Sequence, residues 1–279
     1  MPGPAVGPAT TPGGSGGGAP LVVTHGRTAK KLLRMQWDYP VFQRKAIPGE
    51  VDNTSDEDTV AVATLAALPR EEAFLFIAGD DPRPLLLLRE CESCNGTDNA
   101  LLSKTEGNEK TLLMSRWFHC VKLPTHILKE KHPFTKLFTE FPGKKVPHLF
   151  LTSRDGLLSI PLKGDQSPGE LWKHMEKILS YDYNKKPKGV LKEVTKLLIQ
   201  YDNLDAEESL VEEKMQLELE KNGPKSKKLK KLRKELDRIE TDRSKLKAKE
   251  AKLMDLDLKR KKVEKDLVHS VKEVPANES

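Results

Sequence analysis

The sequence LLLLRECESC, residues 85–94, runs from four leucines almost directly into the pair Cys91 and Cys94. A short apolar run bounded by turn residues is typical of a strand buried inside a sheet. If a helix follows, its first turn can hold both sulfurs close together, and its dipole and free amide groups favour a thiolate. The spacing therefore indicates a candidate redox pair at a strand-to-helix corner.

The composition limits the size of any packed core. Of the 279 residues, 32% are charged and only 5% are aromatic, so we expect one ordinary domain with substantial additional material. No apolar run approaches the roughly 20 residues that a membrane span needs, and no secretory signal is evident. Because three cysteines do not make a secreted disulfide framework, we expect a reduced, cytoplasmic compartment and no membrane partner.

The pattern along the chain divides it into three regions. Residues 1–45 begin with a Gly-, Pro- and Ala-rich tail that we expect to be disordered, and end in a basic, partly apolar segment that could dock onto a core. Residues 46–186 carry the short apolar runs of an α/β domain. Residues 187–275 are expected to be continuous helix, broken once at Asn222-Gly223-Pro224.

Turn residues and apolar periodicity predict the elements of the middle region. In chain order they are a helix capped by Ser55, strands over 73–78 and 84–89, a helix over 99–102, a strand over 112–123, a helix over 126–138, and two hairpin strands over 146–152 and 157–162. A last helix is expected to begin at Pro168, with Ser167 as its cap.

This order of features resembles a thioredoxin-fold domain over roughly residues 71–183. In that family a cis-proline packs beside the cysteine pair, and the backbone before it pairs with an extended substrate chain. By resemblance, Pro147 would be that proline and Val146 the residue before it. The resemblance implies an α/β, thioredoxin-like sheet flanked by helices, without a cofactor.

The activity that the resemblance implies is thiol–disulfide exchange on a protein substrate. Cys91 would be the attacking thiolate and Cys94 the resolving thiol. The sequence departs from the family's Trp-Cys-Gly-Pro-Cys motif, because Glu90 stands in place of Trp and Glu92-Ser93 in place of Gly-Pro. Carboxylates beside a thiol raise its pKa and oppose the helix dipole.

Other interpretations of the cysteine pair stay open. The pair could be an idle remnant on a thioredoxin-like module that binds partners without catalysis. It could also belong to a structural zinc site completed by two of His119, Cys120 and His148, although zinc usually takes two such Cys pairs. Our expectation is that no metal is bound.

The C-terminal region is strongly basic. From Lys221 onward, 20 Lys and Arg stand against 11 Asp and Glu, whereas residues 205–220 are acidic. Apolar residues from Leu229 to Leu253 follow a seven-residue repeat that Arg243 and Glu250 interrupt. We expect a C-terminal helical hairpin or coiled coil, which could form a homo-oligomer. Because Asp and Glu recur along the basic helix and aromatic residues are lacking, we expect no nucleic-acid partner.

Overall fold

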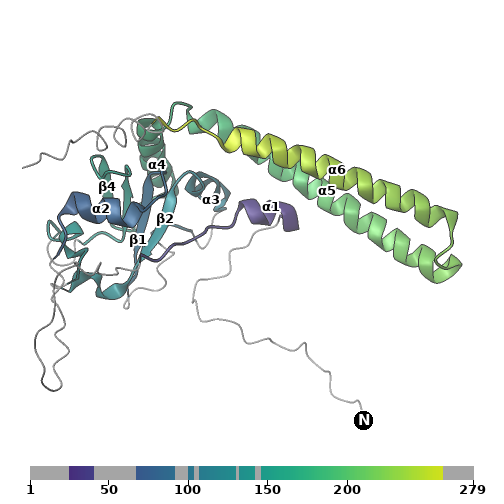
Figure 1. Cartoon of the computed structure of the whole chain (residues 1–279), viewed down its shortest axis with the longest axis horizontal. Helices are drawn as coiled ribbons and strands as arrows, with labels where there is room; N and C mark the ends of the chain where they lie inside the picture. The colour runs from purple at the N-terminus through teal and green to yellow at the C-terminus, as the bar shows by residue number, and fades with distance from the viewer. Residues whose placement is uncertain are drawn as a thin grey trace, which may run out of the picture.

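The computed structural model describes residues 25–40, 67–91, 100–103, 107–129, 132–141 and 146–259. Its centre is a four-stranded sheet in the order β2-β1-β3-β4 (Figure 1). The inner strands are β1 (Leu85–Arg89) and β3 (Leu149–Thr152), which are antiparallel to each other. The edge strand β2 (His119–Leu123) is parallel to β1, and the edge strand β4 (Ser159–Leu162) is antiparallel to β3. The chain is therefore an α/β protein, as the sequence predicts. The tail over 1–24, the Ser55 cap and Cys94 lie outside the described residues.

Apolar residues cover both faces of this sheet, which explains why all five residues of β1 are buried. Leu86 and Leu88 belong to a core shared with α3 (Glu109–Ser115) and α4 (Pro168–Asp182). Leu85 and Leu87 point into a second core, shared with α2 (Arg70–Ala78) and the short 3-10 helices η2 (Thr125–Leu128) and η3 (Thr135–Leu137). A strand buried on both faces reads as a continuous apolar run rather than an alternating one.

The strand predicted over 73–78 is wrong, because this segment lies in helix α2. Its buried residues Ala73, Phe74, Ile77 and Ala78 recur at the spacing of one helix face, whereas Leu75 and Phe76 are exposed. Pro69 and two acidic residues precede them and favour a helix start. A six-residue apolar run cannot by itself distinguish a strand from a helix.

Other boundaries also shift. The first part of the segment 112–123 is helix α3, and the strand begins only at His119. The helix predicted over 126–138 is instead two single 3-10 turns, separated near Pro133. Residues 100–102 form a turn rather than an α-helix.

The β3–β4 hairpin and the helix after it occur where the sequence predicts them, although the two strands begin later, at Leu149 and Ser159. The turn ends at Gly156, which has a positive φ of 74°, and Ser153 N–H donates to Leu158 O across it. In α4 the Ser167 hydroxyl accepts a hydrogen bond from Glu170 N–H, with Pro168 at the first helical position.

Two long helices, α5 (Pro187–Asn222) and α6 (Lys227–Met254), form the predicted antiparallel hairpin and project from the sheet domain (Figure 1). Ion pairs join Asp205 to Arg243 and Glu207 to Arg238. A later residue of α5 thus pairs with an earlier residue of α6, as it must when the two helices run in opposite directions. A third, short helix, α1 (Arg27–Leu32), docks against α5. Thr28 donates both its N–H and its hydroxyl to the Asp205 carboxylate, at 2.7 and 2.6 Å.

Candidate functional site

Cys91 lies just beyond the carboxyl end of β1, the inner strand that the leucine run predicts. Its side chain is partly exposed, and it is disulfide-bonded. Cys120 is a free, buried cysteine, and Cys94, the third cysteine of the chain, lies outside the described residues. Cys91 therefore lies at an accessible end of the sheet, where its sulfur can react with a group on another molecule.

Arg89 ties the Cys91 end of β1 to the segment that contains Val146 and Pro147. Its Nε donates to Pro147 O at 3.1 Å, and its backbone N–H donates to His148 O at 2.8 Å. Pro147 is buried, and Val146 packs partly buried against the second core. The structure therefore brings Cys91, Val146 and Pro147 to the same end of the sheet.

The cis-proline expected from the resemblance is not present. No peptide bond among the described residues is cis, and these include the Val146–Pro147 bond. The trans bond leads the chain directly into β3, because His148 N–H already donates to Leu162 O of β4 at 3.1 Å. The sheet pairing thus begins immediately after Pro147.

Arg89 is only 8% exposed, and this burial affects the pKa values of Arg89 and of the neighbouring His148. Burial lowers the pKa of Arg89, yet a guanidinium keeps its charge in proteins. One guanidinium nitrogen lies 3.3 Å from His148 Nδ1, and burial together with the Arg89 charge lowers the pKa of His148. A fixed positive charge therefore stands two residues before Cys91, beside a histidine that is neutral at pH 7.

A shallow groove of about 420 Å³ opens beside Cys91. One wall comes from the end of β1 and the other from the η2 turn, where Leu128 is exposed and the His126 ring packs edge-on against His132. Its lining residues are Arg89, Glu90, Cys91, Thr125, His126, Leu128 and Lys129. The groove is thus lined by the η2 turn, which the sequence analysis did not connect with the cysteines, and not by Val146 or Pro147.

Zinc ligation that joins Cys91 to His119 or Cys120 is incompatible with the sheet. His119 pairs with Leu85 at the opposite end of β1, roughly 20 Å from Cys91 at the rise of a strand. The Cys120 thiol donates to Ser115 O, and burial raises its pKa to about 12. The described part of the chain holds no group of three or more His, Cys, Asp or Glu residues that could bind a metal ion.

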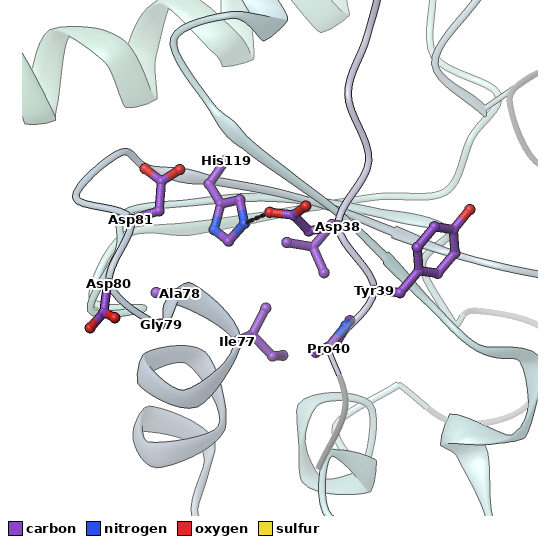
Figure 2. A pocket seen from close by; sticks show the side chains of 10 residues that line it. Asp38, Tyr39, Pro40, Ile77, Ala78, Gly79, Asp80, Asp81 and His119 are labelled. Atoms are coloured by element: carbon purple, nitrogen blue, oxygen red, sulfur yellow. Dashed lines mark hydrogen bonds and ion pairs between the residues drawn. The ribbon is translucent and has the colours of Figure 1, made fainter. Parts of the chain in front are cut away.

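A second pocket, of about 360 Å³, lies at that opposite end of the sheet (Figure 2). Nε2 of the buried His119 lies 2.7 Å from Asp38 Oδ2, and His119 Nδ1 has no hydrogen-bond partner among the described residues. The Arg83 guanidinium donates a hydrogen bond to the Asp81 carboxylate. Burial tends to raise the pKa of Asp81, but the hydrogen bonds and the charge of Arg83 outweigh burial and lower it. The sequence carries no signal for this pocket, because Asp38 and His119 are 81 positions apart.

Comparison with known proteins adds no identification. Neither protein-family models, nor curated proteins, nor solved structures match the chain. Among the residues that the structure describes, no helix is both long and apolar enough to cross a membrane.

Proposed function

We propose that the protein carries out thiol–disulfide exchange on a protein substrate, with Cys91 as the nucleophile and Cys94 as the resolving thiol. The observation that carries this proposal is the position of Cys91, which is partly exposed, follows the carboxyl end of β1 and lies beside a groove that is open to solvent. A reactive thiol needs this combination of access and fixed placement, whereas a structural cysteine is buried like Cys120.

The exchange proceeds in two balanced steps. In the reducing direction, the Cys91 thiolate attacks one sulfur of a substrate disulfide, a mixed disulfide forms and the other substrate sulfur leaves as a thiolate. The Cys94 thiolate then attacks the Cys91 sulfur and releases the second substrate thiolate, so two electrons pass from the dithiol to the substrate. The oxidising direction is the reverse, starting from the disulfide-bonded form of Cys91.

Charges near Cys91 act in opposite directions. Glu90 and Glu92 disfavour the thiolate, whereas the buried Arg89 and Lys129 of the groove favour it. The sequence analysis set the helix dipole against these carboxylates and did not include Arg89. Arg89 offsets it because the side chain is held at Pro147 O and cannot turn away into solvent.

The order of elements supports a thioredoxin-like identity for the sheet domain, which we include in the proposal. β1, Cys91, α3, β2, the η turns, Pro147, the β3–β4 hairpin and α4 follow one another in the order that the resemblance requires. A strand over 73–78 would lie too close to β1 in the sequence for the crossover that parallel neighbouring strands need. That segment is helix α2, so the difficulty does not arise.

An insulin-reduction assay with dithiothreitol tests the proposal. We expect turnover by the wild type, its loss in Cys91→Ser, and a trapped mixed disulfide in Cys94→Ser. Cys120→Ser is the matched control, because this thiol is buried and should be silent. The rate of iodoacetamide alkylation against pH gives the Cys91 pKa. No turnover together with a pKa above about 8.5 would sink the proposal.

A second candidate is a thioredoxin-like module that binds partners without catalysis and assembles through the hairpin into a homo-oligomer. The trans Val146–Pro147 bond favours it, because the resemblance links the cis form to substrate pairing. If the Cys91→Ser variant still binds its partner, this binding candidate is favoured over thiol–disulfide exchange.

A further inference from the structure

Helix α6 carries a line of positive charge along its exposed face, opposite the residues that pack in the seam with α5. The buried or partly buried seam residues recur three and four positions apart, from Leu229 to Leu253. On the opposite side of the helix a second series recurs at the same spacing, and every member is exposed. We call its charged members the basic stripe: Lys227, Lys231, Lys234, Arg238, Lys245 and Lys252. Thr241 and Ala248 are the uncharged members of that series.

The acidic residues of α6 lie off this line. Glu240 pairs with Arg243 in the seam, and Glu250 accepts a hydrogen bond from Tyr201 of α5. Asp242 lies at the flank, where it pairs with Lys245. Glu235 and Asp237 are exposed and flank the stripe, so helical periodicity places every acidic residue of α6 beside the stripe or away from it, and none on it.

Most of the stripe is free of compensating charge in the part of the chain that the structure describes. Arg238 and Lys245 have acidic partners, Glu207 and Asp242. No ion pair is formed there by Lys227, Lys231, Lys234 or Lys252. Lys230 and Lys249, also exposed, adjoin the line and add to it. Positive charge therefore predominates along this line of α6.

We infer that the basic stripe binds the phosphate backbone of double-stranded nucleic acid. From Lys227 to Lys252 the stripe is straight and about 37 Å long at 1.5 Å per residue, which matches about 11 base pairs at 3.4 Å each. It contains no aromatic or large apolar side chain, so it can neither stack on bases nor insert into lipid. Contacts are to phosphates and independent of base sequence.

A linear polyanion fits the stripe better than an anionic membrane does. A membrane is a plane, and a helix lying on it would bring its flanks to the charged surface as well as its outermost line. Asp237 and Asp242 on those flanks would then face the lipid phosphates. A duplex is a rod, and one that lies along the stripe brings its phosphate backbones across the line of lysines while both flanks stay in solvent. This binding is independent of the thiol chemistry proposed for Cys91.

The test is fluorescence anisotropy of the full-length chain with a labelled random-sequence duplex, as DNA and as RNA, between about 50 and 200 mM salt. Each phosphate contact contributes about −0.9 to the slope of log affinity against log salt. The triple variant Lys231→Gln, Lys234→Gln, Lys252→Gln should therefore flatten the slope by about 3 and weaken binding roughly tenfold or more at the lower salt. Glutamine keeps helix propensity close to that of lysine, so α6 should stay folded.

A matched control removes the same charge from exposed lysines on α5: Lys188→Gln, Lys192→Gln, Lys196→Gln. We expect this variant to bind like the wild type. Equal losses in the two variants would mean that net charge alone matters, which overturns the inference. It is equally overturned if the wild type fails to bind either duplex at low salt. Preferential binding to vesicles of phosphatidylcholine and phosphatidylserine, lost in the stripe variant, would assign the surface to membranes instead.

Discussion

Replacing Arg243 by leucine should destabilise the protein, although it would add a leucine to the seven-residue repeat of α6. The Arg243 side chain is 7% exposed and donates to Asp205 at 3.1 Å, to Glu208 and, at 2.7 Å, to Glu240. The side chains of Asp205 and Glu208 are themselves only 9% and 15% exposed. Arg243→Leu would leave these two buried carboxylates with Arg27 as their remaining cation.

The size of the destabilisation depends on the partners that the two carboxylates keep after Arg243 is replaced. Removing one partner of a buried ion pair typically costs about 3–5 kcal/mol. Asp205 retains two hydrogen bonds from Thr28 and an ion pair with Arg27 at 4.0 Å, and Glu208 retains its own ion pair with Arg27. We therefore expect the lower end, about 3 kcal/mol. With a slope of about 3 kcal/mol per molar urea, the unfolding midpoint should fall by about 1 M.

Urea unfolding of the full-length chain, followed by circular dichroism, measures this shift. Asp205→Asn in the Arg243→Leu background removes one of the two buried negative charges, while the amide oxygen can still accept hydrogen bonds from Thr28. Part of the lost stability should therefore be recovered. An Arg243→Leu protein as stable as the wild type would refute the reasoning, since apolar packing alone would then determine the seam.

Three further outcomes are expected. Burial lowers the pKa of His25, but its bonds to two carboxylates outweigh this and raise it above 6.5; their stabilising effect is complete below pH 6.5 and is lost as pH rises through the raised value. The urea midpoint of His25→Gln should therefore approach that of the wild type in alkaline buffer, and a constant gap would contradict the assignment. Because burial raises the pKa of Cys120 to about 12, iodoacetamide should label Cys91 but not Cys120 in the reduced native protein, as read by mass spectrometry. Gly156→Ala should cost about 1–3 kcal/mol in urea unfolding, because φ is positive and the new methyl group meets the Phe74 ring; Gly169→Ala in α4, with open space around it, should cost nothing.

The sequence predicted what depends on local pattern. The run from Leu85 to Leu88 and the cap at Ser167 led directly to β1 and α4, because burial and capping leave signatures within a few residues. The prediction for the α2 segment was wrong because it too used only local pattern. Six apolar residues fit either a strand or a short helix, and the packing against Phe134 and its neighbours determines that the segment is a helix.

The site was predicted in part. The leucine run placed Cys91 at a sheet edge, but the η2 turn that forms the groove was expected to be a helix. The pairing of Asp38 with His119 joins distant segments and leaves no periodic trace. Arg243 and Glu250 were visible as breaks in the leucine repeat, yet their partners on α5 could be found only once the two helices were aligned in register.

The hairpin is held to the sheet domain at both of its chain ends, so it is not a flexible appendage. Leu191 and Leu198 at the start of α5 share the core of Met114 and Leu179. After α6 the chain returns to the start of α5, where Lys185 N–H donates to Leu256 O at 3.0 Å, and the Trp117 indole donates to Met254 O at 2.8 Å. Removing the hairpin would therefore expose the core of the sheet domain, and substitutions on its surface are the cleaner probe of its role. If the basic stripe binds a duplex, this attachment holds the Cys91 edge of the sheet at a fixed position relative to it.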